Sequence, residues 1–82
     1  MVIKKNRTAE AERLSMALGT RVAELRYERN WSQRDLAERA ARIDRAYVSR
    51  IETGQTECGL GTIGAIARAF GLSISELFER VE

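Results

Sequence analysis

Apolar residues recur at spacings of three and four along the whole chain, and no segment alternates with a period of two. The first spacing places apolar side chains on one face of an α-helix, whereas a half-buried β-strand needs alternation. The sequence also contains no proline, the residue that most strongly interrupts a helix. Its 82 residues are enough for one small domain. We therefore predict a compact, all-α fold with a single core.

Five segments carry the helical pattern. The first extends from about Thr8, a predicted N-cap, to Arg29, and it contains Gly19. This glycine either divides the segment into two helices or allows a neighbouring element to approach closely. We expect the other four helices at residues 33–41, 45–53, 60–70 and 74–80. Residues 1–16 are predicted to form a basic N-terminal arm and a helical extension, and residues 17–82 the compact domain.

Capping residues support these boundaries. Ser73 and Glu76 form an S-x-x-E capping box, in which each side chain binds the backbone N–H of the other residue. Ser32 and Asp35 form a variant of the box with aspartate in place of glutamate. Asp44 is a third predicted N-cap.

Basic residues are concentrated in the first two thirds of the chain. Residues 21–50 carry eight arginines and five acids, whereas residues 51–82 carry two arginines and five acids. Twelve of the fourteen basic residues are arginine, whose planar guanidinium suits phosphate and guanine. This distribution favours contact with nucleic acid, although charges that keep helix surfaces soluble explain many of the same residues.

Several other kinds of function are not expected. Histidine is absent, which removes the commonest general base and metal ligand, and the acids are scattered among arginines at helical spacing. One cysteine, Cys58, cannot form an intrachain disulfide or a zinc site, so we expect a free thiol. We expect no enzymatic activity, no cofactor and no metal. No apolar run has a membrane-spanning length and no signal peptide is apparent, so we expect a cytoplasmic protein.

The segment ARIDRAYVSRIETG, residues 41–54, is apolar on one side and rich in arginine on the other. Tyr47, Val48 and Ile51 fall at helical spacing, with arginines and a serine between them. A surface helix explains this pattern. A helix that reads DNA explains it better, provided that the neighbouring segments match.

The neighbouring segments do match a known arrangement. The chain contains, in order, SQRDLAERA, a short turn, DRAYVSRIETG and LGTIGAIARAFGL. This succession resembles the helix-turn-helix domain of the Xre/Cro/phage-repressor family over about residues 17–80. The segment DRAYVSRIE looks most like controller proteins of restriction–modification systems and like small phage-type repressors. The resemblance implies a five-helix, lambda-repressor-like domain that binds double-stranded DNA as a homodimer on a palindromic operator.

The resemblance also implies roles for individual residues. The helix at 45–53 would lie in the major groove, where Arg45 and Arg50 would contact guanine and Ala46 a thymine methyl group. Gln33 would anchor a phosphate at the start of the preceding helix. The full set of implied DNA contacts is Gln33, Arg34, Arg42, Arg45, Ala46, Tyr47, Ser49, Arg50, Gln55 and Thr56. A structural ion pair is implied between Arg26 and Glu52.

The turn before the recognition helix departs from the family pattern. Ala41-Arg42-Ile43 contains one residue more than usual and no glycine. Either the preceding helix is longer or Arg42 takes a left-handed conformation. The loop after the recognition helix also departs, because Glu57 stands where a basic or amide residue commonly meets phosphate.

We expect the dimer to form through an apolar patch near the C-terminal end, made of Leu60, Ile63, Ile74, Leu77, Phe78 and Val81. In the alternative, Leu77 and Phe78 close the core of the monomer. The basic arm with Lys4, Lys5 and Arg7 either contacts DNA or is a disordered tail. Two other functions stay open at this point: an antitoxin that binds its own promoter, and a protein-interaction module that binds no DNA.

Overall fold

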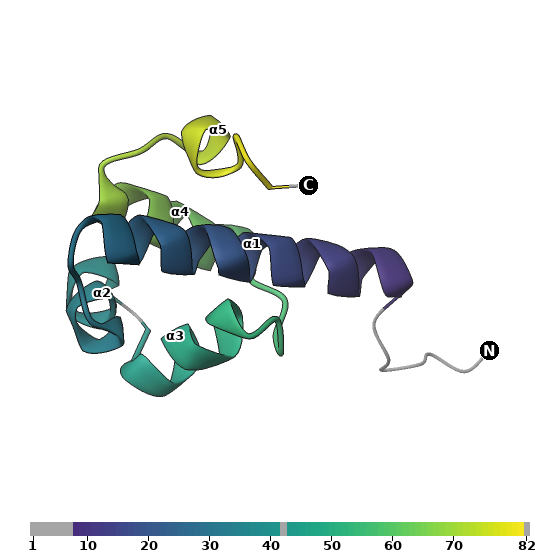
Figure 1. The fold of residues 1–82 in the computed structure, drawn as a ribbon, viewed down its shortest axis with the longest axis horizontal. Helices are drawn as coiled ribbons and strands as arrows, with labels where there is room; N and C mark the ends of the chain where they lie inside the picture. Colours follow the sequence, from purple (N-terminus) through teal and green to yellow (C-terminus); the bar gives the residue numbers. More distant parts are fainter. Residues whose placement is uncertain (1–7, 42, 82) are drawn as a thin grey trace.

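The structure, a computed structural model, describes residues 8–41 and 43–81, and in this part of the chain all regular structure is helical. The helices are α1 (Ala9–Glu28), α2 (Gln33–Ala40), α3 (Arg45–Glu52), α4 (Leu60–Phe70) and α5 (Ile74–Leu77). The long α1 crosses the molecule, with α2 and α3 on one side and α5 on the other (Figure 1). The predicted all-α fold is confirmed. The basic arm, residues 1–7, lies outside the described residues.

The predicted N-caps all begin helices. The Ser32 hydroxyl accepts the Asp35 N–H at 3.0 Å, and the Asp35 carboxylate accepts the Ser32 N–H at 2.8 Å. Ser73 and Glu76 make the same reciprocal pair at the start of α5. The hydrogen bonds from the backbone and side chain of Ser32 lower the pKa of Asp35 below its ordinary value. The charged form of the box therefore persists to a lower pH than that of an ordinary aspartate.

Gly19 lies inside an unbroken α1, so the segment is one helix. A Cβ atom built on Gly19 would fall on the backbone of Ile51 and Glu52, 2.9 Å from the Glu52 carbonyl carbon. Real Cβ contacts are essentially never this short. The second alternative from the sequence is therefore correct: the glycine allows α3 to lie directly against α1.

The turn between α2 and α3 shows how the chain accommodates its unusual sequence. Helix α2 ends at Ala40, so it is not longer than expected. Ala41 has a φ of 47° and a ψ of 147°, a sparsely populated combination that costs about 1–3 kcal/mol. Arg42, the residue expected to be left-handed, lies outside the described residues. The strain identified in this turn is thus at Ala41, the residue directly after α2.

Helix α5 is shorter than predicted, since it ends at Leu77 instead of residue 80. After α5 the chain turns so that Val81 is buried, with 9% of its surface exposed. The buried Arg21 of α1 donates hydrogen bonds to the carbonyls of Leu77 and Glu76, at 3.0 and 2.9 Å. These carbonyls lie near the end of the helix, where intrahelical donors are missing. Arg21 therefore fixes the end of α5 against α1.

One hydrophobic core contains residues of all five helices. Trp31, just before α2, stacks on Phe70 at the end of α4, with ring centroids 5.4 Å apart. The buried hydrophobic residues are Leu18, Val22, Leu25, Leu36, Ala37, Ala40, Val48, Ile51, Ile63, Ile66, Ala67, Phe70, Leu77 and Val81. Within the described ranges, no helix combines the length and the hydrophobicity required to cross a bilayer.

Candidate nucleic-acid interface

Helix α3 has one buried face and one exposed face. Val48 and Ile51 are essentially fully buried against α1 and α2. The opposite face presents the exposed Arg45, Ala46 and Arg50. Ser49 and Tyr47 are partly exposed, and the Arg50 guanidinium lies 5.3 Å from the centroid of the Tyr47 ring. The solvent-facing side of α3 is thus a short surface of arginine, serine and small apolar groups.

The expected ion pair between α1 and α3 is formed. Arg26 donates to both carboxylate oxygens of Glu52, with Nε–Oε2 at 2.7 Å and Nη2–Oε1 at 2.9 Å. Its third nitrogen, Nη1, donates to the Trp31 carbonyl at 2.8 Å. The two side chains are 8% and 7% exposed, and the hydrogen bond to Glu52 raises the pKa of Arg26 above its ordinary value. The C-terminal end of α3 is therefore fixed to α1 by a buried, bidentate contact.

Gln33 belongs to the same network, which the sequence did not predict. Its Nε2 donates to Glu52 Oε1 at 3.0 Å, and this oxygen also accepts a bond from Arg26. Gln33 is the first residue of α2. One carboxylate thus orients the start of α2 and the end of α3 relative to α1.

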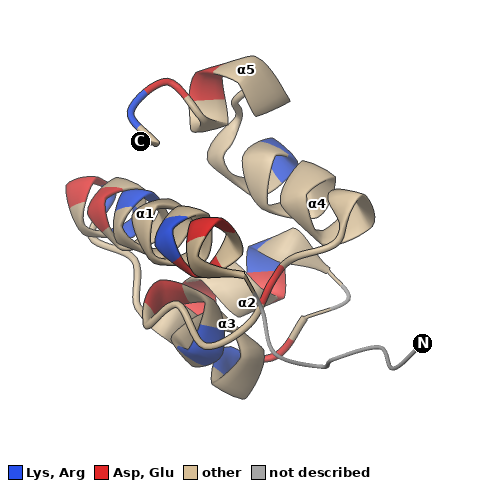
Figure 2. Cartoon of the chain, turned by 90° about the vertical axis from the view of Figure 1, so that its right-hand side faces the viewer, with Lys and Arg blue, Asp and Glu red and all other residues tan. Residues whose placement is uncertain are grey.

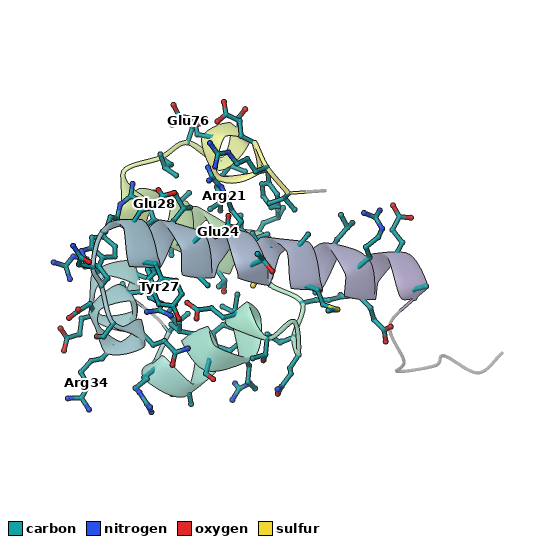
Figure 3. All side chains as sticks on the ribbon, viewed as in Figure 1. Arg21, Glu24, Tyr27, Glu28, Arg34 and Glu76 are labelled. Atoms are coloured by element: carbon teal, nitrogen blue, oxygen red, sulfur yellow. The ribbon has the colours of Figure 1, made fainter. Side chains whose placement is uncertain are left out.

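A polar depression lies where α1, α2 and α3 meet, and we call it the three-helix hollow. Figure 3 shows Tyr27 on the side of α1 that faces α2 and α3, and Arg34 pointing away from the body. Arg34 of α2 and Arg45 of α3 are both exposed and line the hollow. Its lining residues are Arg26, Tyr27, Ser32, Gln33, Arg34 and Arg45. Tyr27 was not predicted as a site residue, because it belongs to no motif of the family resemblance.

Part of the arginine content has a structural role, which corrects the interpretation of charge made from the sequence. Arg21 and Arg26 are buried and bonded within the fold. Arg29 donates to the carbonyls of Leu25 and Phe70, the latter at the end of α4. Basic residues also mark α3, at the bottom of Figure 2, away from α5. The exposed arginines of α2 and α3 are Arg34, Arg39, Arg45 and Arg50.

The remaining implied DNA contacts lie in the loop after α3 or outside the described residues. Gln55 is exposed, directly after Gly54, which has the expected positive φ of 74°. The Thr56 hydroxyl donates to the Glu57 carbonyl at 3.4 Å, so it is directed along the loop. Arg42 is not described. The structure therefore brings together Gln33, Arg34, Arg45, Ala46, Tyr47, Ser49 and Arg50, with Gln55 and Thr56 at the far end of α3.

The expected dimer patch is smaller than predicted. Ile63, Leu77 and Val81 are 9%, 0% and 9% exposed, because they fill the core of the single chain. A short chain needs nearly all of its regularly spaced apolar residues for its own core. Leu60 and Ile74 remain on the surface at 80% and 46% exposure, and Phe78 is half-buried.

The described ranges contain one thiol and no candidate metal-binding cluster. Across residues 8–41 and 43–81, no cluster of three or more carboxylate, thiol or imidazole side chains is placed to hold a metal ion. Cys58 is a free thiol and is half-buried, and burial raises its pKa above the ordinary value. A thiol with a raised pKa is a poor nucleophile near neutral pH.

The fold and this surface define a helix-turn-helix protein: two short helices, α2 and α3, cross with the second one exposed. A family model described as "Helix-turn-helix" matches residues 22–77. The chain therefore belongs to the helix-turn-helix family, of the Xre/Cro type, as the resemblance implied.

Two relatives are named as a transcriptional regulator and as a repressor. The chain is 39% identical over 67 residues to the HTH-type transcriptional regulator DdrOP3 of Deinococcus deserti, a match that covers 82% of this chain and 51% of the relative. It is 36% identical over 62 residues to the immunity repressor protein of Bacillus phage phi105, covering 76% of this chain and 42% of the relative. The chain thus spans about half the length of these curated relatives.

Solved structures show the same architecture. The restriction–modification controller protein C.AhdI of Aeromonas hydrophila superposes with a TM-score of 0.74 at 36% identity, over 78% of this chain and 96% of that one. The clp gene regulator ClgR of Corynebacterium glutamicum gives a TM-score of 0.77 at 26% identity, over 83% of this chain and 71% of that one. The lambda-repressor-like arrangement expected from the sequence is thus shared with known regulators.

Proposed function

We propose that the protein is a sequence-specific DNA-binding transcription regulator, a repressor or autoregulator, that inserts α3 into the major groove. The observation that carries the proposal is the construction of α3. Its inner side is fixed to α1 by the buried Arg26–Glu52 pair, while its outer side presents arginine, serine and alanine to solvent. The protein would act in the cytoplasm, without a cofactor and without catalysis.

We assign the recognition of DNA bases to the exposed face of α3. Arg50 can donate two hydrogen bonds to O6 and N7 of guanine, and Ala46 offers a methyl group to thymine. Ser49 lies beside them and can donate to or accept from a base edge. Gln33 and the free N–H groups at the start of α2 would meet a phosphate, which sets the position of the protein on the duplex.

The relatives support regulation by repression. The matched proteins are named as a transcriptional regulator, an immunity repressor and a restriction–modification controller protein. A repressor acts by occupying an operator, and this requires specific binding by a preformed surface. The fixed α3 of this chain meets that requirement.

Replacing Arg50 by alanine should weaken binding to the best operator by about 1–3 kcal/mol and relax the preference at one base pair. Affinity for random duplex should change little, because a base contact contributes mainly on the correct sequence. Fluorescence anisotropy with both duplexes measures the two effects. Arg68→Ala is the matched control, because Arg68 is exposed on α4, at the end of that helix. Equal losses on both duplexes would show that Arg50 contacts phosphate instead.

We also propose that the regulator binds a palindromic operator as a homodimer. One eight-residue helix contacts only a few base pairs, and a two-fold axis doubles the sequence that is read. Of the patch predicted from the sequence, the exposed Leu60 and Ile74 and the half-buried Phe78 remain available for the interface. The last third of the chain has a net charge of −3, which favours a position away from DNA.

Sedimentation at micromolar concentration should give twice the 9.3 kDa mass of one chain. Ile74→Ser should shift the protein toward the monomer, because it places a polar group in the interface. Met16→Ser is the control: Met16 is an exposed apolar residue, at 59%, on α1 and outside the proposed patch. Monomer mass for the unmodified chain, or equal shifts for both variants, would contradict an interface at Ile74.

A further inference from the structure

The most exposed aromatic side chain in the described part of the chain is Tyr27, at 68% exposure, on the last turn of α1. It stands at the edge of the three-helix hollow, facing α2 and α3 (Figure 3). An aromatic ring this exposed contributes little to the core. Its position next to two exposed arginines raises the question of what it contacts in a complex.

Tyr27 is held in place although it is exposed. The Arg26 guanidinium lies 4.5 Å from the centroid of its ring. Arg26 cannot move freely, because it is bonded to both oxygens of Glu52 and to the Trp31 carbonyl. Interaction with Tyr27 also contributes to the raised pKa of Arg26, after the larger contribution of Glu52. The phenol is thus oriented before any ligand arrives, which lowers the entropy cost of a contact.

The charges around the hollow favour an anion. Its lining includes three arginines and no acidic side chain, and the Glu52 carboxylate, which accepts a hydrogen bond from Gln33 of the lining, is already paired with Arg26. The phenol hydroxyl and the guanidinium groups of Arg34 and Arg45 are all hydrogen-bond donors. Donors from α1, α2 and α3 line one open depression. A tetrahedral anion with several acceptor oxygens, such as a phosphate group, fits this arrangement.

We propose that the three-helix hollow binds one phosphate of the DNA backbone, and that Tyr27, Arg34 and Arg45 are its side-chain ligands. This inference rests on the proposed function and extends it in two ways. It adds Tyr27 to the interface, and it assigns Arg45 to the backbone instead of the base edge implied by the family resemblance. Ala46, Ser49 and Arg50 then carry the reading of bases.

Tyr27→Phe and Arg45→Ala test the assignment through different observables. Tyr27→Phe removes one neutral donor, so affinity should fall about 3- to 10-fold on operator and random duplex alike, with an unchanged salt dependence. Arg45→Ala removes a charge, so the slope of log affinity against log salt should become smaller by about one on both duplexes. Arg68→Ala again serves as the control for loss of an exposed charge.

A scan with methylphosphonate identifies the phosphate itself. Each phosphate of the operator is replaced in turn by the uncharged methylphosphonate, and affinity is measured for the unmodified protein and for both variants. One position should weaken the unmodified protein strongly and the two variants much less, because they have already lost that contact. Additive effects at every position, or unchanged affinity of Tyr27→Phe on both duplexes, would overturn the proposal.

In a last experiment, inorganic phosphate is added to the protein without DNA, and binding is followed by the NMR chemical shifts of residues in the hollow. We expect weak binding that the DNA duplex displaces. Phosphate binding that persists when operator is saturating would show a site for the free anion, and it would overturn the backbone assignment. If the unmodified protein binds no duplex, the proposed function itself fails and this inference fails with it. If only this inference fails, the unmodified protein binds its operator normally, and no phosphate position shows coupling with Tyr27→Phe or Arg45→Ala.

Discussion

Gly19→Ala should lower the free energy of unfolding by about 3 kcal/mol, the upper end of the usual cost of overpacking. The added methyl group would fall on the backbone of Ile51 and Glu52, which cannot rotate away as a side chain can. Helices α1 and α3 would have to separate, and the contacts of α3 with the core would weaken. Urea denaturation followed by circular dichroism measures the change.

The sign of this effect is diagnostic, because alanine is normally the better helix residue. In an open helical position, glycine to alanine stabilises by about 0.5–1 kcal/mol. Gly64→Ala is the matched control: Gly64 lies inside α4, and a Cβ atom there would meet nothing within 4 Å. We expect opposite signs for the two substitutions. A Gly19→Ala variant as stable as Gly64→Ala would mean that α1 and α3 are not in direct contact.

Glu52→Ala should cost about 3–5 kcal/mol, because it leaves the buried Arg26 without its partner. A small domain has a total stability of about 5–15 kcal/mol, so the variant would lose a large part of it. Gln33 would also lose its bond to Glu52, and the start of α2 would be less well oriented. Thermal and urea denaturation of the variant test the expectation.

The exposed pair of Glu10 and Arg13 provides the control, since its side chains are 75% and 55% exposed. Glu10→Ala should change stability by about 0.5 kcal/mol or less. The double variant Arg26→Met with Glu52→Leu should recover much of the loss of Glu52→Ala, because the unpaired buried charge is gone. A Glu52→Ala variant no less stable than Glu10→Ala would contradict the buried network.

Local signals explain how much of the fold could be predicted. Capping by Ser32, Asp44 and Ser73 depends on neighbours three residues away, so the sequence contains all the partners. The predicted length of α5 is wrong, because the end of this helix contacts a partner that is distant in the sequence. Arg21 binds carbonyls 55 and 56 residues further along the chain, and no local pattern reveals this.

The candidate site divides in the same way. The Arg26–Glu52 pair followed from the resemblance to a family, since 26 residues separate its partners. The sequence predicts Ile63 and Val81 in a surface patch and leaves Leu77 open between that patch and the core, because regular apolar spacing does not distinguish a core from an interface. Tyr27 belongs to no motif, and its position beside Arg45 arises only when α1 and α3 pack together. At Gly19 the sequence does not distinguish a break in the helix from the close approach of another element, because that depends on the packing of α3.

Selection from a random pool of duplex DNA tests the central proposal most directly. The protein is mixed with the pool, bound duplexes are recovered over several rounds, and the affinity for the recovered sequence is compared with that for a scrambled duplex at the same salt concentration. The expected result is a palindromic consensus bound at least about a thousand-fold more tightly than the scrambled duplex. Recovery of no consensus, with equal affinity for every duplex or no binding at low salt, would contradict the assignment of α3 as a recognition helix.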